Sequence, residues 1–364
     1  FFGEVLRWGD MLFECGLKLN TKDTDKGVVN PGDAYGRLFN QKDYSAMSEA
    51  IFWKKYSVAD GVFHDLNGLL AGGVVDQDGP AGVSGDLVNT YLNADGTPIN
   101  PNDAKFKDFN KTFENRDLRL TETVMSTGYK FRSTVKGSKP LKVADVASGE
   151  KDINPPFMAT EGNAKSVTGY HIRLGVDTTY VEKQSETGLV IMRYADALLC
   201  YAEAAEELGQ CTDDVLNKTL KPLRERAGVT YVKPAAIDPN FTDYGYPLTP
   251  VMQEIRRERR VELALQGYRL DDLMRWNGAK AFAGKRGRGA YFGKESLLYN
   301  SFTDEQKEKL TTILVDGNGW TDPLQELLPG GYQFKENRDY LLPIPPSELD
   351  LNKEMVQNPG WEIK

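Results

Sequence analysis

The chain has 364 residues, of which 40% are hydrophobic and 27% charged, an ordinary composition for a globular protein with a sizeable core. Its formal net charge of −8 gives it no general attraction for phosphate backbones, which argues against a nucleic-acid partner. No apolar run approaches the roughly 20 residues that cross a bilayer, and three cysteines without a short repeated spacing indicate neither a disulfide framework nor a zinc site.

Residues 1–19 have the pattern of one amphipathic helix ending near Gly16. Its apolar side chains recur at steps of three and four residues, at Phe1, Val5, Trp8, Leu12 and Cys15. Because Trp8 lies on this apolar face, we expect it in the core. No capping residue or turn precedes the pattern, so we expect the chain to be the C-terminal part of a longer protein whose N-terminal part is missing.

Residues 20–188 form an irregular zone that is rich in Gly, Asn, Asp and Pro. Two short runs within it, residues 50–56 and 129–135, have the composition of β-strands. Asp76 and Asp78 could offer oxygen ligands to a structural calcium ion, although the full EF-hand loop is absent. The zone therefore predicts loops with short strands, and it implies no cofactor.

Helical periodicity returns in residues 189–277 and predicts two helical hairpins. The first joins a helix over residues 189–208, ended by Gly209, to a second helix over about residues 212–227. Helices joined by short turns, with alanine where they cross, are typical of tetratricopeptide-like repeats.

The second hairpin begins at Thr249, a good N-cap, with Pro250 in the first turn, where its missing N–H costs nothing. This helix is expected to run to Gly267 and to be followed by a shorter helix over residues 268–276. The two hairpins and the first helix together form the predicted scaffold.

Residues 278–364 are expected to be mostly loop, with one polar helix near residues 303–315 and a tail punctuated by prolines. The glycine-rich segment 284–289, GKRGRG, lacks the strand–turn–helix context of a nucleotide-binding loop. We interpret it as a basic, flexible loop.

The helix of the second hairpin is dense in charge. Glu254 and Arg257, like Arg259 and Glu262, are three residues apart, so that opposite charges are neighbours on the helix surface. From these residues alone we interpret the helix as solvated and held by surface ion pairs. The interleaved glutamates argue against phosphate binding.

Five segments occur in one order: residues 79–98 (GPAGVSGDLVNTYLNADGTP), 115–120 (NRDLRL), 190–209 (VIMRYADALLCYAEAAEELG), 254–276 (EIRRERRVELALQGYRLDDLMRW) and 340–361 (YLLPIPPSELDLNKEMVQNPGW). Together they resemble the SusD/RagB family of nutrient-binding lipoproteins. Ser84-Gly85-Asp86 replaces the usual Pro-Thr near the place where members often bind ligand, which makes Asp86 a candidate contact. Tyr268 takes the place of the usual His.

The resemblance implies a mainly α fold, with tetratricopeptide-like helical hairpins and a large loop-rich segment containing short strands. We expect residues 1–364 to form one intertwined SusD-like domain. The family's members are lipid-anchored at the outer-membrane surface of Bacteroidetes-type bacteria, where they cover a SusC-like TonB-dependent transporter. Their ligands are chiefly oligosaccharides and sometimes peptides. Here the lipid anchor would lie outside the chain.

The residues that could support catalysis do not form a known motif. His64 and His171 lie in different segments, and no G-x-S-x-G elbow is present. Asp271 and Asp272 could form a glycosidase pair, but flanking arginines favour ion pairing within the scaffold. We therefore predict a binding protein rather than an enzyme. A purely structural scaffold, a peptide-binding protein and, with less support, a glycoside hydrolase stay open as alternatives.

A sugar site needs an exposed aromatic face beside amides and carboxylates that bind hydroxyl groups. Trp276 and Trp361 belong to the family segments and are expected to be structural, which leaves Trp53 and Trp320. Trp320 follows an Asp-Gly-Asn-Gly loop without an evident core role. A second candidate segment combines a ring with polar groups, at Phe63, His64, Asp65 and Asn67.

Overall fold

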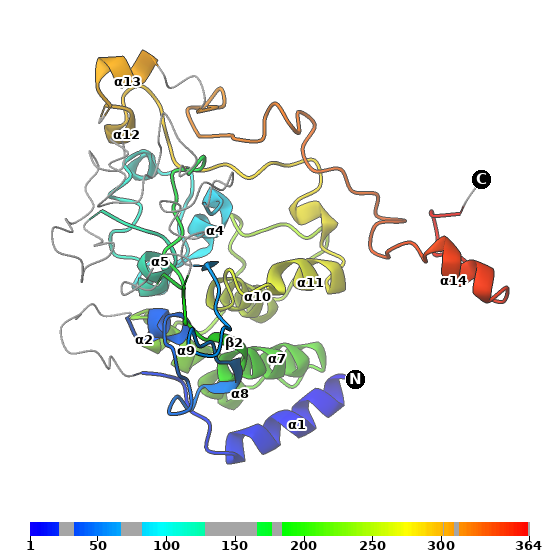
Figure 1. The fold of residues 1–364 in the computed structure, drawn as a ribbon. Coiled ribbons are helices and arrows are strands. Elements are labelled where there is room, and N and C mark those ends of the chain that lie inside the picture. Colours follow the sequence, from blue (N-terminus) through cyan, green and yellow to red (C-terminus); the bar gives the residue numbers. More distant parts are fainter. Residues whose placement is uncertain are drawn as a thin grey trace.

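Helices form the lower layers of the molecule, and a loop-rich part with short helices covers them (Figure 1). The computed structural model describes residues 1–21, 33–66, 82–127, 166–176, 184–300, 302–308 and 313–362. The helices of the lower layers are α1 (Phe2–Glu14), α7 (Tyr194–Glu207), α8 (Asp213–Lys218), α9 (Leu220–Arg226), α10 (Pro250–Glu262) and α11 (Tyr268–Arg275). The mainly α fold is confirmed.

Shorter elements complete the fold. Two strands, β1 (Ala50–Lys54) and β2 (Leu189–Arg193), form a small antiparallel sheet. The short helices are α2 (Asp33–Gly36), η1 (Arg37–Phe39), α4 (Gly85–Thr90), η2 (Ala104–Lys107), α5 (Leu118–Thr123), η3 (Ala279–Ala281), α12 (Leu297–Asn300), α13 (Asp304–Glu308) and α14 (Pro346–Leu351).

The first helix packs against α7, but not through its tryptophan. Gly9 is the close contact, because a Cβ there would lie 2.3 Å from the ring of Tyr201. Phe13 packs edge-on against the same ring at 5.1 Å. Trp8 is 54% exposed and lies under the Arg7 guanidinium, so the prediction that it belongs to the core is wrong. The helix ends at Glu14, before the expected boundary.

The segment 189–193 is a strand, not the first turn of a helix as predicted. It pairs with β1 in antiparallel register, from Ala50 opposite Arg193 to Lys54 opposite Leu189. The run Leu-Val-Ile-Met is compatible with both a helix and a strand, and its hydrogen-bonded pairing with β1 makes it a strand. The helix therefore begins at Tyr194. The predicted strand at residues 50–56 is confirmed over Ala50–Lys54, whereas the one at 129–135 lies outside the described residues.

The second helix of the first hairpin is broken in two, although one helix was predicted over residues 212–227. Thr212 caps α8 as its hydroxyl accepts from the Val215 amide. Between α8 and α9, the buried Thr219 has φ −116° and ψ −81°, outside the helical region. Its hydroxyl donates to the Val215 carbonyl at 2.7 Å, so a local side-chain bond accompanies the break.

The second hairpin begins as predicted. The Thr249 hydroxyl accepts from the Met252 amide at 2.9 Å, and Pro250 is the first residue of α10. The helix ends at Glu262 rather than near Gly267, because Leu265 adopts a positive φ of 61°. Gly267 instead has the left-handed conformation immediately before α11.

The C-terminal part is mostly loop, as expected, but its helices differ. Of the helix expected over residues 303–315, the structure shows α13 at Asp304–Glu308, and residues 309–312 lie outside the described residues. Val315 is not helical but pairs with Thr321 in an isolated bridge. The tail carries α14, which was not predicted, away from the body (Figure 1). The Trp361 indole donates to the Leu341 carbonyl at 3.0 Å, which agrees with a structural role.

Helix α10 is buried along nearly its whole length, so the prediction of a solvated, surface-paired helix is wrong. Glu254, Glu258 and Glu262 are four residues apart and share one face, where like charges repel. Four buried arginines from other segments oppose them. The ion pairs join Arg119 to Glu258 (2.5 Å) and Glu262 (2.7 Å), Arg193 to Glu262 (2.5 Å), Arg224 to Glu254 (2.6 Å) and Glu258 (3.0 Å), and Arg226 to Glu262.

The arginines of α10 form only one of the two ion pairs that were predicted within the helix. The pair between Glu254 and Arg257 is present at 3.0 Å. Arg259 does not pair with Glu262 but with Asp272, at 3.1 Å. Four positions from each other on a helix of 3.6 residues per turn, Arg256 and Arg260 lie near one face.

The family segment at residues 115–120 meets α10 in this network. Asp117 and Arg119 are both 1% exposed and paired at 2.7 Å, and Arg119 continues to the glutamates of α10. Arg116, beside them, donates to the carbonyl groups of Val88, Tyr91, Leu92 and Thr112. The loop-rich part is thus joined to the helical layers by buried charge as well as by apolar packing.

Stability is expected to depend on pH through one buried histidine. Burial lowers the pKa of His171 from 6.5 to about 4, so the unfolded chain binds a proton that the folded chain does not. Stability is therefore unaffected above about pH 6.5 and falls below it, by about 2 kcal/mol at about pH 5. Chemical denaturation at both pH values should show this loss, and His171→Gln should remove it. An unchanged slope in the variant would contradict the assignment.

Candidate functional site

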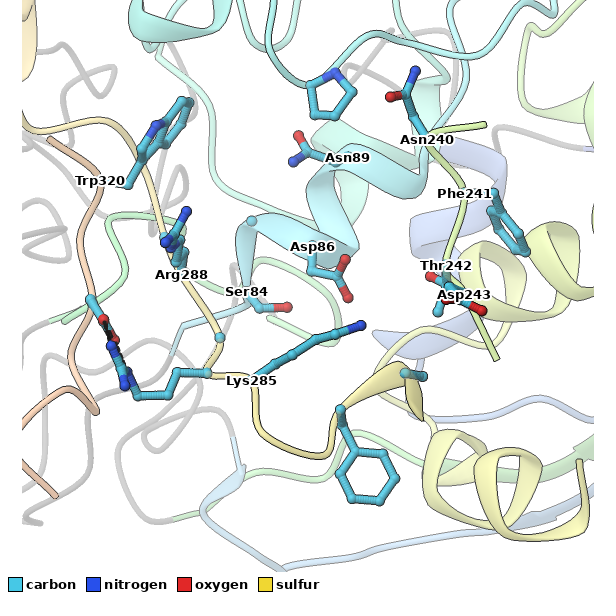
Figure 2. A pocket seen from close by; sticks show the side chains of 18 of the residues that line it. Ser84, Asp86, Asn89, Asn240, Phe241, Thr242, Asp243, Lys285, Arg288 and Trp320 are labelled. Atoms are coloured by element: carbon cyan, nitrogen blue, oxygen red, sulfur yellow. Dashed lines mark hydrogen bonds and ion pairs between the residues drawn. The ribbon is translucent and has the colours of Figure 1, made fainter. Parts of the chain in front are cut away.

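A cavity of about 1200 Å³ lies between the loop-rich part and α10 and α11. Its walls come from segments far apart in the chain: α4 with Ser84 and Asp86, the loop at residues 240–243, the basic segment 284–289, and the loop at residues 318–322. Figure 2 shows these side chains converging on one space. The cavity is the candidate site.

Backbone hydrogen bonds hold the basic segment 284–289 in the cavity wall. The Gly85 amide donates to the Arg288 carbonyl at 2.6 Å, which ties the segment to α4. The Gly289 amide donates to Thr321 at 2.9 Å. A Cβ at Gly289 would lie 2.1 Å from the Thr168 carbonyl oxygen, so only glycine allows this close passage. The segment is a loop, as predicted, but backbone hydrogen bonds fix it in the cavity wall, whereas its composition predicted a flexible loop.

Aromatic and amide groups that line the cavity suit a carbohydrate. Trp320 is half-buried and packs edge-on against Tyr291 at 5.3 Å. Phe241 comes from the opposite side of the cavity (Figure 2), but its ring packs against Tyr244 and lies under the Arg257 guanidinium. The side-chain amides of four lining residues have no hydrogen-bond partner among the residues that the structure describes: Asn89, Asn102, Asn240 and Asn318. Such a surface offers ring faces for the C–H groups of a sugar and free amides for its hydroxyls.

Asp86 is the central carboxylate of the cavity. Its side chain is 66% exposed and pairs with Arg260 at 2.5 Å. Desolvation by the surrounding walls works against ionisation, yet the neighbouring Arg260, Arg269 and Lys285 lower the pKa of Asp86. Asp86 is therefore ionised at neutral pH. Figure 2 shows the Lys285 side chain extending through the cavity below it.

The residues predicted as ligand contacts fall in two places. Asp86 and Trp320 line the same cavity, although 234 positions separate them in the numbering. The segment with Phe63, His64 and Asp65 does not line it. His64 pairs with Ser185 in an isolated bridge, and its Nε2 lies 2.8 Å from the Thr187 carbonyl oxygen.

The remaining predicted contacts lie at the surface or outside the described residues. Phe63 is 46% exposed, so the alternative site remains a surface feature near the small sheet. Asn67 lies outside the described residues, as do Asp76 and Asp78 of the suggested calcium site. Within the described ranges, no group of three or more His, Cys, Asp or Glu side chains could hold a metal ion.

The acidic pair that could have suggested a glycosidase belongs to the scaffold. Asp272 is 3% exposed and binds Arg259 at 3.1 Å and Arg275 at 2.7 Å. Its neighbour Asp271 is exposed and does not line the cavity. Trp276 is likewise structural: it is 5% exposed, and its indole donates to Glu203 at 2.6 Å. Among the described helices, none is long and apolar enough to cross a membrane.

Several residues of the cavity were missed by sequence reasoning. Arg260 was assigned to a solvated helix face, and Arg269 only to scaffold ion pairing. Lys285 and Arg288 belong to the basic segment 284–289, for which the sequence alone predicts a loop and no ligand contact. The signal was present in GKRGRG, whose glycines mark close backbone approach, whereas nothing in the sequence indicated that Phe241 would lie opposite Trp320.

Comparison with known proteins agrees with this architecture. The sequence model of the SusD family matches residues 69–361. In fold, the chain is similar to a SusD-like carbohydrate-binding protein of Bacteroides fragilis, with a TM-score of 0.65 and 23% identity. The match covers 97% of this chain and 61% of that protein. A SusD-like protein from the same organism gives a TM-score of 0.64 at 20% identity, covering 99% and 62% of the two chains.

A relative in sequence is a SusD-like protein of Formosa agariphila, which is 35% identical over 96 residues. These residues are 26% of this chain and 18% of that protein. The chain thus spans about three fifths of the length of the two solved structures and matches a smaller share of the Formosa relative. Because the family match extends over most of its length, the chain belongs to the SusD family.

Proposed function

We propose that this protein binds oligosaccharides without cleaving them and delivers them to a SusC-like TonB-dependent transporter. The observation that carries the binding role is the cavity. It is lined by Trp320 and by the amides of Asn89 and Asn240, which have no partner within the described part of the chain. Membership of the SusD family and the fold similarity to a SusD-like carbohydrate-binding protein support it. We place the protein at the outer-membrane surface of a Bacteroidetes-type bacterium, lipid-anchored outside this chain.

The binding role is tested with Trp320→Ala. Removing a ring that stacks on a sugar is expected to weaken oligosaccharide binding about tenfold or more in isothermal titration calorimetry. Trp361→Ala is the matched control, because Trp361 is also a partly exposed indole but lies on the tail, away from the cavity. Equal loss in both variants, or loss in neither, would contradict the proposed site.

The delivery role is a separate step with its own experiment. The full-length protein, purified with mild detergent from cells that express the neighbouring transporter, should co-purify with a TonB-dependent barrel. Co-purification that persists in Trp320→Ala is expected, because that substitution changes the cavity alone. Absence of the barrel from the purified material would remove the transporter from the proposal and leave glycan binding intact.

A further inference from the structure

The cavity has an excess of positive charge, although the chain as a whole is acidic. Six cationic and four acidic side chains line it, while the formal net charge of the chain is −8. A net positive concavity on a net negative protein concentrates anions locally, since opposing walls focus the field. The positive charge of the cavity is therefore specific to this site, because the chain as a whole carries a negative net charge.

Some of these cations are already neutralised by the protein. Arg286 is bound by Asp322 through two nitrogens, at 3.0 and 2.6 Å, and is occupied by nearby carbonyl groups as well. Arg288 pairs with Asp316 at 2.9 Å. These two arginines hold the wall together, and their charge is not available to a ligand.

Two other cations are different. Lys285 is exposed in the cavity and Arg269 is half-buried, and neither forms an ion pair within the described part of the chain. Arg269 donates a hydrogen bond of 3.2 Å from its Nη1 to the Tyr244 hydroxyl, and its guanidinium lies 5.8 Å from the centre of the same ring. Its guanidinium therefore has donors left for a ligand.

These two cations converge with a third on one carboxylate. Arg260, Arg269 and Lys285 each act on Asp86, but only Arg260 is bound to it. Burial lowers the pKa of Arg269, and the nearby positive charge of Arg260 lowers it further. Asp86 is thus shared by three cations. Asp243, on which Lys285 also acts, is already bound by Lys280 at 2.8 Å. A second anion would therefore balance the remaining charge of Arg269 and Lys285.

We infer that the cavity selects acidic glycans, with a carboxylate or sulfate group of the sugar lying between Arg269 and Lys285. This inference rests on the proposed function and names its ligand class. A guanidinium matches both groups because its planar donors bind two oxygens at once, and the ammonium of Lys285 adds a compact charge. A further sugar unit of the same chain reaches Trp320, which makes charge and ring contact parts of one site.

Matched pairs of ligands test the charge requirement. Oligogalacturonides are compared with their methyl esters, and sulfated galactan oligosaccharides with desulfated ones, by isothermal titration calorimetry. The charged member of at least one pair is expected to bind about tenfold more tightly, and the difference should shrink in 0.5 M salt because screening weakens exposed charge pairs. Which pair shows the difference identifies the anion as carboxylate or sulfate.

Matched variants test the position. Lys285→Gln and Arg269→Gln should each weaken binding of the charged ligand about fivefold, at the upper end for exposed ion pairs. Lys233→Gln makes the same change of charge at an exposed residue that pairs with Asp213 outside the cavity, and should leave affinity unchanged. Charged ligand bound equally well by all three variants would overturn the inference.

The outcomes separate this inference from the proposed function. If the protein binds neutral glycans as tightly as acidic ones, the charge selection is wrong and the glycan-binding role stands. If it binds no glycan in either form, both fail. Thermal unfolding of each variant, unchanged from the wild type, shows that lost affinity does not come from lost folding.

Discussion

Glu262→Gln is expected to lower the free energy of unfolding by about 4 kcal/mol, the cost of breaking a buried ion pair on one side. Glu262 is fully buried and bound by three arginines: Arg119, Arg193 and Arg226. The amide keeps the shape of the side chain but removes its charge. The three guanidiniums then stay buried but lose the carboxylate that they share, and they keep only Asp117, Glu258 and Glu49 as partners. Urea denaturation at neutral pH should show the loss.

Glu225→Gln is the control, because Glu225 is 57% exposed and faces Lys221 at 3.9 Å. Its expected effect is below about 0.5 kcal/mol. Equal effects of the two substitutions would contradict a network that joins the two parts of the fold.

The dependence on pH gives a second check of Glu262. Burial opposes its ionisation, but the arginines hold its pKa well below the usual range. A carboxyl group with a depressed pKa contributes stability above its unfolded pKa of about 4.3, and the contribution declines as the pH falls below that value. The difference between the wild type and Glu262→Gln should therefore narrow below about pH 4. A constant difference down to about pH 2 would be inconsistent with an ionised Glu262.

Arg116→Met is the second substitution with a large expected effect, about 4 kcal/mol. The guanidinium donates to four carbonyl oxygens around the end of α4, and each would lose a donor at about 1 kcal/mol. Methionine fills much of the volume without replacing the bonds. Since α4 carries Asp86 and Asn89, glycan affinity should fall together with stability.

Two further variants serve as a control and as an intermediate change for Arg116→Met. Arg7→Met makes the same replacement at a side chain that is 59% exposed, and it should change the unfolding free energy by less than about 0.5 kcal/mol. Arg116→Lys keeps the charge but loses the guanidinium's reach, so an intermediate loss is expected. A tolerated Arg116→Met would mean that the carbonyl groups find other donors and that Arg116 does not position α4.

The helices were predictable where local chemistry decides them. Thr249 and Pro250 begin α10 as expected because capping acts within one turn. The strand at 189–193 was missed because its partner, β1, lies about 140 residues earlier in the numbering, and pairing overrode a helical pattern. The break at Thr219 is accompanied by a hydroxyl hydrogen bond, and the spacing of apolar residues gives no sign of either.

The spacing of the glutamates in α10 is a sequence feature that indicates the buried ion-pair network. Glu254, Glu258 and Glu262 repeat at four-residue spacing, which a solvated helix would avoid because like charges repel there. The spacing therefore requires cations from elsewhere in the chain. Four arginines supply them: Arg119 of the NRDLRL segment, Arg193, Arg224 and Arg226. Their assignment to specific partners needed the fold.

The sequence predicted some residues of the candidate site but not that they lie in one cavity. Trp320 and Asp86 were identified separately, one from a loop without core role and one from a departure within a family segment. Their common cavity depends on contacts such as Arg260 with Asp86, which are 174 residues apart. The segment at Phe63 had similar chemistry but lies at another place, because its backbone pairs with Ser185.

The location of a bound oligosaccharide tests the account most directly. A crystal structure of the protein with the tightest ligand found by calorimetry should show a sugar ring against Trp320 and hydroxyl groups within hydrogen-bond distance of Asn89 or Asn240. A sugar bound instead beside Phe63 and His64, with the cavity empty, would contradict it.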